Sequence, residues 1–173
     1  MDLKKLIREI PDFPQPGVSF KDISTVLKNA EAFRHIIVTL ADYYRSARPE
    51  LVVGVESRGY ILGAPLAYEL QCGFVLVRKP GKLPAETERI DYSLEYGENS
   101  LEIHVDAIRP GQKVLIVDDI LATGGTISAT AELVKRLGGD IIGYAFLAEL
   151  DALKGREKLP KDVPILSLLH YDD

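Results

Sequence analysis

Apolar residues follow two alternating patterns along this chain. Largely apolar runs are typical of strands buried on both faces of a sheet, and they occupy 51–55, 73–77, 113–117, 140–150 and 164–169. Between them, apolar residues recur at helical spacing, which predicts helices after Asn29, over 59–70 and over about 126–137. This alternation predicts a single α/β domain over 1–173, with a central, mainly parallel sheet flanked by helices.

Local features of the N-terminal part extend this pattern. Asn29 can cap a helix whose buried side carries Phe33, Ile36, Ile37, Leu40 and Tyr44. Residues 3–10 are also expected to be helical, because one helical face would carry Leu3, Leu6, Ile7 and Ile10. The proline-rich segment 11–24 between these two helices is expected to be a loop.

The region 79–105 has the pattern of a flexible hairpin. YSLEY and SLEIHV alternate apolar and polar residues around GENS, as the strands of an antiparallel hairpin do. The preceding stretch GKLPAETERID is long, charged and interrupted by proline, which is typical of a mobile lid. We therefore expect residues 79–105 to form a flexible β-hairpin lid.

Composition and charge limit the possible partners. The apolar content of 46% in 173 residues is sufficient for one hydrophobic core. No apolar stretch is long enough to cross a bilayer or to serve as a signal peptide, and a single cysteine suits a reducing compartment. We therefore expect a cytoplasmic protein without a membrane partner. The net charge of −5 argues against nucleic acid as a partner.

Basic residues gather in two short clusters instead. The cluster RKPGK, over 78–82, suits a small anionic ligand better than a polyanion. For the second cluster, KGREK over 154–158, we favour the interpretation as a solvated loop.

The stretch VLIVDDILATGGT, residues 114–126, has the clearest chemistry. Its apolar part is predicted to be a central strand, so the acids and glycines would lie at the carboxyl end, where open α/β sheets bind ligands. The loop ATGGT leads directly into a helix, whose first amides and dipole attract an anion. Gly124 and Gly125 permit close approach of a phosphate, while Thr123 and Thr126 add hydroxyl donors.

Asp118 and Asp119 must address another part of the ligand, because carboxylates repel phosphate. The hydroxyl groups of a ribose are suitable donors for them, so the stretch predicts a ribose 5-phosphate site. A helix cap and a simple bend are the structural alternatives for the individual residues. The sequence contains no Walker A motif and no G-x-G-x-x-G motif, which leaves other common nucleotide sites unsupported.

VLIVDDILATGGT resembles the 5-phosphoribosyl 1-diphosphate signature of the type I phosphoribosyltransferases. Over nearly the whole chain, further blocks resemble those of the adenine phosphoribosyltransferase family in order: PDFPQPGVSFKDIS, VESRGYILGAPLA, RKPGKLP, YSLEYG and LKGREKL. The resemblance implies the type I phosphoribosyltransferase fold, with a base-recognition hood over residues 1–28. It also implies a purine-salvage enzyme, a homodimer that transfers phosphoribosyl to adenine and forms AMP and pyrophosphate. No protein metal ligand is implied, since Mg²⁺ would be held mainly by substrate and water.

The same resemblance distributes the substrates over named residues. The ribose 5-phosphate would contact Asp118, Asp119, Ala122, Thr123, Gly124, Gly125 and Thr126. The pyrophosphate would contact Glu56, Ser57, Arg58, Arg78, Lys79, Lys82 and Tyr96. The resemblance also implies a cis peptide between Glu56 and Ser57, and a reach of Arg78 across the dimer interface. Adenine would lie between Phe20 and Ile120 and would be read by backbone groups of Ser19 and Lys21.

Three residues would carry the catalysis. The resemblance makes Glu95 the proton-transfer group near purine N7, whereas Arg58 and Lys79 would stabilise the departing pyrophosphate. The reacting carbon would pass through an oxocarbenium-like state, so the lid is expected to exclude water. Lys21 departs from family members with arginine at that position. A contact of the base to its side chain would be weakened by this change, whereas a contact to its backbone would not.

Three alternatives stay open on the sequence alone. The same fold with another base, such as hypoxanthine, guanine or xanthine, is one of them. A regulator that binds the nucleotide without catalysis is another, although no basic helix-turn-helix is evident. An esterase is the third, because VESRG nearly matches the G-x-S-x-G elbow around Ser57. Its first glycine is missing, however, and none of His35, His104 and His170 has the context of a catalytic base.

Overall fold

A five-stranded parallel sheet forms the centre of the structure, a computed structural model that describes residues 1–94 and 97–172. The strand order is β4-β3-β7-β8-β9. The strands are β3 (Leu51–Val55), β4 (Gly73–Val77), β7 (Lys113–Leu121), β8 (Asp140–Leu150) and β9 (Ile165–Tyr171). All five were expected from the apolar runs, so the prediction of a mainly parallel α/β sheet is confirmed.

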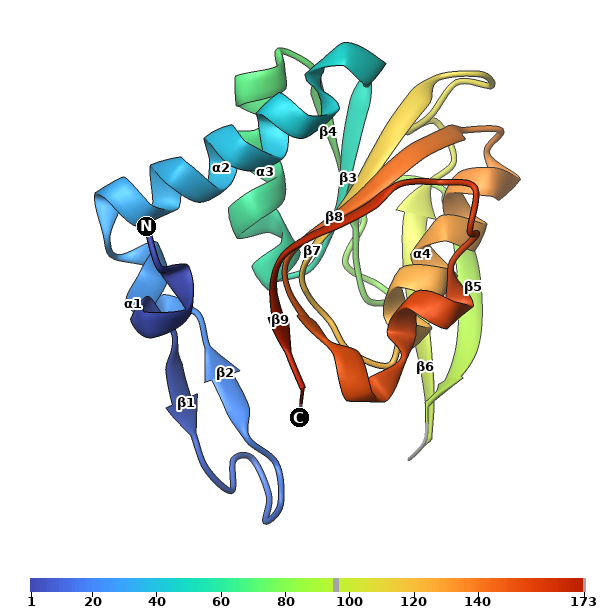
Figure 1. Ribbon diagram of the computed structural model, residues 1–173. Coiled ribbons are helices and arrows are strands. Elements are labelled where there is room, and N and C mark those ends of the chain that lie inside the picture. The colour runs from blue at the N-terminus through green and yellow to red at the C-terminus, as the bar shows by residue number, and fades with distance from the viewer. Residues whose placement is uncertain (95–96, 173) are drawn as a thin grey trace.

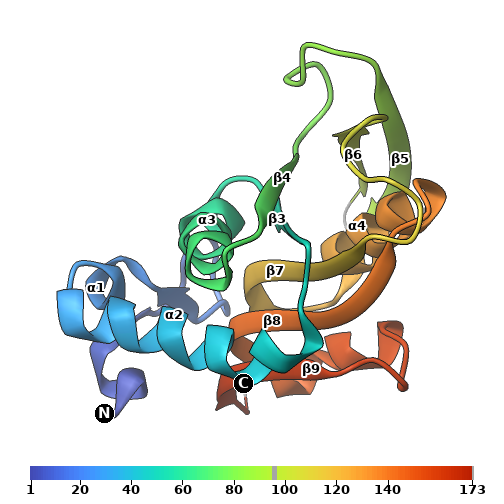
Figure 2. The same cartoon turned by 90° about the horizontal axis from the view of Figure 1, so that it is seen from above.

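Helices cover both faces of this sheet (Figures 1 and 2). One face carries α2 (Ala30–Tyr44) and α3 (Arg58–Leu70), and the other carries α4 (Gly125–Arg136). Because alternate residues of a strand point to opposite faces, each strand feeds two cores. In β3, Val52 belongs to the core under α2 and α3, whereas Val53 belongs to the core under α4. None of the described helices is long and apolar enough to cross a bilayer.

Two local contacts explain why the helices form where the sequence predicted them. The Asn29 side chain accepts a hydrogen bond of 3.0 Å from the N–H of Ala32 and caps α2. Gly54 of β3 and Gly63 of α3 both lie against the ring of Phe74, and a Cβ on Gly63 would lie 2.6 Å from that ring. These small residues therefore permit the close packing of α3 on the sheet.

The predicted helix over residues 3–10 is wrong. Only Leu3–Leu6 form a short 3-10 helix (η1), and Arg8–Ile10 form strand β1. This strand pairs antiparallel with β2 (Phe20–Asp22), which lies in the segment expected to be a loop. The hydrogen bonds between the two strands outweigh the helical spacing of the apolar residues here, a competition that a single-sequence pattern does not reveal.

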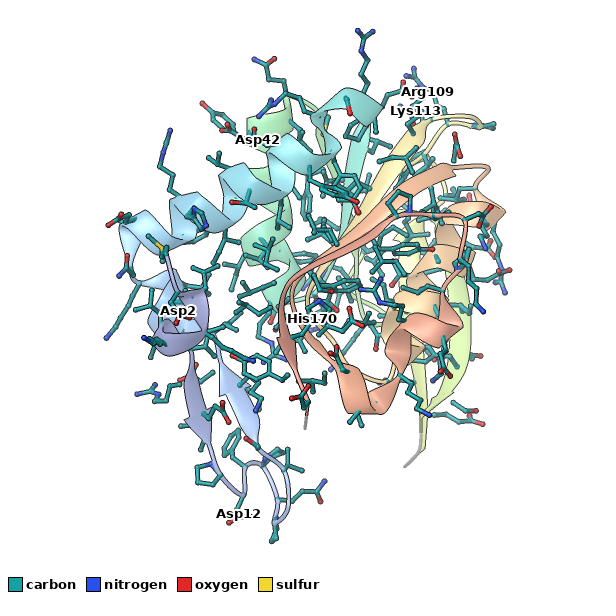
Figure 3. The ribbon with its side chains drawn as sticks, in the orientation of Figure 1. Asp2, Asp12, Asp42, Arg109, Lys113 and His170 are labelled. Carbon is teal, nitrogen blue, oxygen red and sulfur yellow. The ribbon has the colours of Figure 1, made fainter. Side chains whose placement is uncertain are left out.

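The β1–β2 hairpin stands apart from the central sheet. An ion pair of 2.5 Å between Arg8 Nη2 and Asp22 Oδ2 joins its two strands, and α1 (Ser24–Leu27) leads from it toward α2. In Figure 3, Asp12 lies at the tip of the loop between the strands, away from the sheet. The hairpin therefore projects beyond the carboxyl ends of the central strands, where the substrate site was expected.

The predicted second hairpin is present, but its turn was misplaced. Strand β5 (Thr87–Leu94) pairs antiparallel with β6 (Gly97–His104), and Leu94 lies opposite Gly97. GENS, the predicted turn, lies in β6 instead. Much of the stretch expected to be a loop is also strand, because β5 begins at Thr87.

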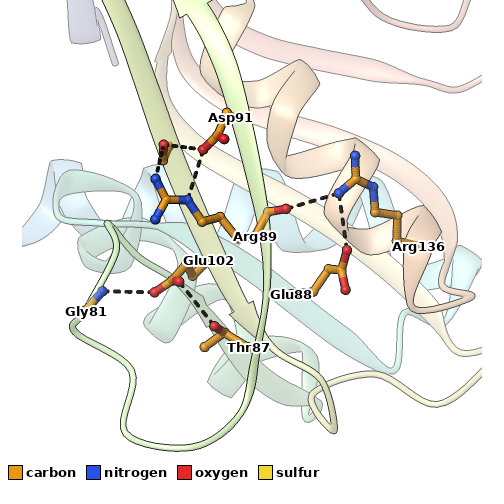
Figure 4. Close-up of polar contacts among 8 residues, drawn as sticks. Gly81, Thr87, Glu88, Arg89, Asp91, Glu102 and Arg136 are labelled. Carbon is orange, nitrogen blue, oxygen red and sulfur yellow. Dashed lines mark hydrogen bonds and ion pairs between the residues drawn. The ribbon is translucent and has the colours of Figure 1, made fainter.

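Side chains anchor the base of this hairpin, as Figure 4 shows. Arg136 of α4 donates hydrogen bonds of 3.2 Å to Glu88 and 3.1 Å to the carbonyl of Arg89. Glu102 of β6 accepts a hydrogen bond of 2.9 Å from the N–H of Gly81, in the loop after β4. The hairpin is thus fixed at its base to the helix that begins at the predicted phosphate loop.

Strand β4 is less buried than the sequence predicted. It is the edge strand of the sheet, and its burial alternates, with Leu76 41% exposed and Val77 fully buried. Cys72, the residue just before β4, is half-buried against the core under α2 and α3. The apolar run over 73–77 was read as buried on both faces because edge and central strands look alike in the sequence.

Candidate functional site

One cleft of about 310 Å³ gathers two groups of predicted site residues. It lies where β7 ends and where β2 approaches the sheet from the projecting hairpin. Arg58 and all four predicted adenine residues (Ser19, Phe20, Lys21 and Ile120) line it, together with the segment Asp118–Thr126. The structure therefore brings together side chains and backbone from three distant parts of the chain.

The loop between β7 and α4 is shaped by backbone contacts. Gly124 has φ of 86°, a left-handed conformation that favours glycine, and α4 begins at the next residue. The hydroxyls of Thr126 and Tyr92 are 3.2 Å apart, which links this loop to β5. The amides at the start of α4 and the adjacent helix dipole suit an anion, as the sequence predicted.

The KGREK cluster is exposed except for Gly155, as expected of a solvated segment, but it also supports this loop. Its Gly155 is buried against the loop, and a Cβ on Gly124 would lie 2.6 Å from the Gly155 carbonyl oxygen. Arg156 forms an ion pair of 2.7 Å with Glu149, which is only 5% exposed. Lysine and arginine content indicated a solvated surface here, whereas the contacts depend on the glycine and on one buried acid.

The two adjacent acids share the floor of the cleft with Arg58. Arg58 Nε lies 2.9 Å from Asp119 Oδ2, and the Asp119 N–H donates a hydrogen bond of 2.9 Å to Asp118 Oδ1. Surrounding protein desolvates the Asp118 carboxyl, which raises its pKa well above its usual range, and the Asp119 carboxylate raises it further. Without a ligand, burial beside the Asp119 carboxylate therefore disfavours the charged form of Asp118.

An aromatic ring forms the opposite wall of the cleft. The Phe20 ring packs edge-to-face on Phe13, with centroids 5.1 Å apart, and the Arg58 guanidinium lies 5.5 Å from the Phe20 centroid. Ile120 lines the same cleft from the end of β7. A flat apolar ligand has matching surfaces here, although Arg58 would need room beside it.

The Lys21 side chain is engaged in contacts within the protein. Its Nζ lies 3.0 Å from Glu9 Oε2 and 3.2 Å from Ser19 Oγ, and 4.5 Å from the centroid of the Tyr171 ring. Lys21 is 3% exposed, and its ammonium group contacts Glu9 and Ser19 near the N-terminus and Tyr171 of β9. Among the groups of Lys21, its backbone is therefore the part that remains suited to ligand recognition.

The residues predicted to bind pyrophosphate meet at the carboxyl ends of β3 and β4. The predicted cis peptide between Glu56 and Ser57 is present. Glu56 accepts a hydrogen bond of 2.7 Å from the Lys79 N–H and lies 3.1 Å from Lys82 Nζ and 3.4 Å from Arg78 Nε. Burial acts to raise the pKa of Glu56, but these hydrogen bonds and charges outweigh it and lower the pKa.

The residues Glu56–Arg58, Arg78, Lys79 and Lys82 form a basic corner, which borders Asp118 and Asp119 directly. A Cβ on Gly59, which follows Arg58 in α3, would lie 3.0 Å from Asp118 Oδ1. Of the corner's predicted residues, Arg58 alone also lines the cleft in the part of the chain that the structure describes. Glu95 and Tyr96, predicted for catalysis and the lid, lie outside the described residues.

Sequence reasoning missed several contributors to the candidate site. Four further residues line the cleft: Val18, Leu121, Ile127 and Leu150. Gly155 packs against the loop that is predicted to bind phosphate. Leu150 is the last residue of β8, and its position at the carboxyl end of a predicted strand was an available signal. Gly155 had no such signal, because its importance comes from a contact with a loop far away in the sequence.

The esterase alternative lacks a base. His35 is exposed on α2, and His104 accepts a hydrogen bond of 3.3 Å from the Ala85 N–H in the hairpin. His170 lies 2.8 Å from Asp151, beside a second cavity of about 720 Å³. None of the three lines the cleft as the described residues define it. Ser57 therefore has no histidine partner of the kind that a hydrolase elbow requires.

Comparisons with known proteins agree with this geometry. A family model described as a phosphoribosyl transferase domain matches residues 22–170. The adenine phosphoribosyltransferase of Synechococcus sp. is 57% identical over 172 residues, which is 99% of this chain and 100% of the relative. The crystal structure of the enzyme from Thermoanaerobacter pseudethanolicus superposes with a TM-score of 0.94 at 55% identity, over 98% of both chains.

A more distant structure carries ligands. The Saccharomyces cerevisiae adenine phosphoribosyltransferase, complexed with adenine and D-2,5-dideoxy-2,5-imino-altritol 1,6-bisphosphate, has a TM-score of 0.92 at 41% identity, over 97% of both chains. The sheet, the acid pair and the glycine loop thus define a phosphoribosyltransferase of the type I fold. Within that class, this chain belongs to the adenine phosphoribosyltransferase family.

Proposed function

We propose that the 310 Å³ cleft is where this chain carries out the reaction of its family. In that reaction a phosphoribosyl group passes from 5-phosphoribosyl 1-diphosphate to adenine, giving AMP and pyrophosphate. The observation that carries the assignment is the placement of the Asp118–Thr126 segment opposite Phe20 in one cleft. A nucleoside monophosphate has the same three parts in the same order: an anion, a diol and a flat base.

The ribose phosphate part of the proposal follows from the donors and acceptors of the loop. Amides at the start of α4, with the hydroxyls of Thr123 and Thr126, would bind the 5-phosphate. Asp118 and Asp119 would accept hydrogen bonds from the ribose hydroxyls, which would add donors to the one N–H that Asp118 already accepts. Binding would then favour the charged form of Asp118, because hydrogen bonds to a carboxylate lower its pKa.

The basic corner would hold the departing pyrophosphate. The corner contains Arg78, Lys79 and Lys82, and charges aimed at the leaving group are the main means of stabilising this transition state. Arg58, between the corner and the cleft, can contact the leaving group if it releases Asp119. Ligand binding would therefore exchange ion pairs within the protein for ion pairs with phosphate.

Mg²⁺ belongs to the same proposal. The ion would bind oxygens of the diphosphate and the ribose, complete its shell with water, and neutralise charge on the leaving group. The cleft fits such an ion, because its carboxylates can hold coordinated water while the substrate supplies the ligands. Among the described residues, the group of acids and histidine that could hold a metal directly is Glu149, Asp151 and His170, which lies outside the cleft.

The base would lie between Phe20 and Ile120, and the backbone of Ser19 and Lys21 would read its polar edge. A contact through the backbone agrees with the structure, because the Lys21 side chain forms an ion pair with Glu9. The assignment of proton transfer to Glu95 stays a prediction. So does the closing of the β5–β6 hairpin as a lid, although its anchored base would suit motion confined to its tip.

A homodimer is the expected assembly. Large apolar residues are exposed on α3 and on the edge strand β4: Ile61 by 40%, Tyr68 by 86% and Leu76 by 41%. A second copy of the chain placed on this face would cover them. The reach of its Arg78 toward the site stays a prediction from the family resemblance. We also place the reaction in the cytoplasm, since both phosphorylated compounds are anions that do not cross bilayers unaided.

Initial velocities with different bases test the proposed function. The enzyme, 5-phosphoribosyl 1-diphosphate and Mg²⁺ are expected to release pyrophosphate rapidly with adenine and at least tenfold more slowly with hypoxanthine, guanine or xanthine. Equal rates with hypoxanthine would reassign the base. Absence of pyrophosphate release with every base, in a protein that still binds AMP, would support the nucleotide-binding regulator instead.

A further inference from the structure

The short 3-10 helix η4 (Gly155–Lys158) lies behind the loop that is proposed to bind the 5-phosphate. We infer that Arg156, on this helix, is a positioning residue for that loop. It does not line the cleft in the described residues, and it acts through Gly155 next to it. The inference rests on the proposed function, because it takes Ala122–Thr126 as the 5-phosphate site.

The contact between η4 and the loop is formed by backbone. A Cβ on Gly155 would overlap the carbonyl oxygen of Ala122 and would lie 3.0 Å from the amide nitrogen of Gly124. From the other side, a Cβ on Gly124 would lie 2.6 Å from the carbonyl oxygen of Gly155. The two glycines therefore pack against each other with no side chain between them, and any movement of Gly155 displaces the loop.

Arg156 fixes the position of η4 through a buried acid. Its Nε and Nη2 donate hydrogen bonds of 3.1 and 2.7 Å to the two oxygens of Glu149, a bidentate arrangement. Ser167 of β9 donates a third, of 2.7 Å, to the same carboxylate. Glu149 is 5% exposed and pairs in register with Leu121, the last residue of β7 before the loop.

The acid is therefore rigidly held at the point where the phosphate loop begins. Burial acts to raise the pKa of Glu149, but the hydrogen bonds from Arg156 and Ser167 outweigh it and lower the pKa. Loss of the guanidinium would leave a charged, buried carboxylate without its main partner. We expect η4 to shift in response, and Gly155 to move with it, so that the loop amides no longer converge on one phosphate.

Binding of AMP and of pyrophosphate to Arg156→Met, measured by calorimetry, tests this inference. AMP uses the loop, whereas pyrophosphate uses the basic corner, so the variant is expected to bind AMP on the order of tenfold more weakly and pyrophosphate as the wild type does. Glu149→Gln is expected to show the same selective loss, and the double variant no further loss, since both act through one contact. Arg156→Lys should lose less, because it keeps the charge but not the bidentate geometry.

Two controls separate the possible outcomes. Arg45→Met removes an exposed arginine that pairs with Asp42, remote from the cleft, and should leave binding of both ligands unchanged. Thr126→Ala removes a proposed phosphate donor directly. Normal AMP binding by Arg156→Met together with weak binding by Thr126→Ala would overturn the inference alone, as would equal losses for AMP and pyrophosphate. Normal AMP binding by both variants would overturn the proposed function itself.

Discussion

The two ends of the proposed substrate site are built differently. At the ribose phosphate end, the β7–α4 loop takes its shape from its backbone, with Gly124 in a left-handed conformation against Gly155. At the pyrophosphate end, the basic corner consists of side chains, and those of Arg78 and Lys82 are paired with Glu56. One end is therefore formed before the ligand arrives, and the other must exchange its internal partners for the ligand.

The two ends are therefore expected to differ in how strongly they hold their ligands. A preformed loop loses little conformational entropy when it binds a phosphate, so it can fix the part of the substrate that never reacts. The paired corner would bind the proposed pyrophosphate without holding it too tightly, because Glu56 pairs with the same cations. A weak hold on the product suits an enzyme that must release pyrophosphate in every turnover.

The largest expected effect comes from breaking the preformed end. Gly124→Ala would place a Cβ 2.6 Å from the Gly155 carbonyl oxygen on a backbone with φ of 86°, so the loop must deform. We expect the KM for 5-phosphoribosyl 1-diphosphate to rise on the order of 100-fold, with little change in pyrophosphate binding. Steady-state kinetics in both directions measure this split.

Gly111 provides the matched control for that variant. It has the same φ of 86°, but nothing lies within 4 Å of an added Cβ. Gly111→Ala should therefore lower stability by about 1 kcal/mol through backbone strain, while both KM values stay as in the wild type. An equal rise in KM for the two variants would mean that the contact with Gly155 is not what shapes the site.

A smaller effect, of opposite sign, is expected at the paired end. Glu56→Gln keeps an acceptor for the Lys79 N–H but removes the charge that pairs with Lys82 and Arg78. Pyrophosphate should bind several-fold more tightly, and its affinity should depend more steeply on salt. Weaker pyrophosphate binding, measured by calorimetry, would mean that Glu56 organises the corner rather than competing for it.

The smallest effect is a pH dependence of stability at the preformed end. Because the pKa of Asp118 is raised in the folded, ligand-free chain, the folded state holds more protons than the unfolded state above about pH 4. The free energy of unfolding therefore falls as the pH rises from about 4 through the raised pKa of Asp118. Asp118→Asn should remove this loss, so its Tm should exceed that of the wild type by a few degrees at pH 8 and by less at pH 5.

A constant difference in Tm at all pH values would contradict the proposed desolvation of Asp118. The prediction also separates stability from function at one residue. The variant that stabilises the ligand-free protein should bind AMP more weakly, because asparagine is a poorer acceptor for the ribose hydroxyls than a carboxylate. The buried Asp118 carboxyl thus lowers the stability of the ligand-free protein, which could not be inferred from the sequence pattern.

The sequence predicted the parts of the fold that depend on neighbouring residues. Apolar runs placed the five central strands, and Asn29 marked the start of α2. The predicted helix over 3–10 was wrong because its second half pairs with β2, and the turn at GENS was wrong because register is set by cross-strand contacts. Local periodicity cannot express either kind of long-range pairing.

The site shows the same division. The acids and glycines of VLIVDDILATGGT were recognisable because strand, loop and helix follow one another directly. Phe20 needed the family resemblance to be placed, since only the fold brings the projecting hairpin to the end of β7. The pairing of the basic corner with Glu56 and the support of Gly124 by Gly155 became visible only in the structure.

A crystal structure with bound AMP tests the central claim most directly. The 5-phosphate is expected to accept hydrogen bonds from the amides of Thr123–Thr126, with the ribose hydroxyls on Asp118 and Asp119 and the base against Phe20. A 5-phosphate bound at Arg78 and Lys82, or a nucleotide bound in the larger cavity beside His170, would contradict it.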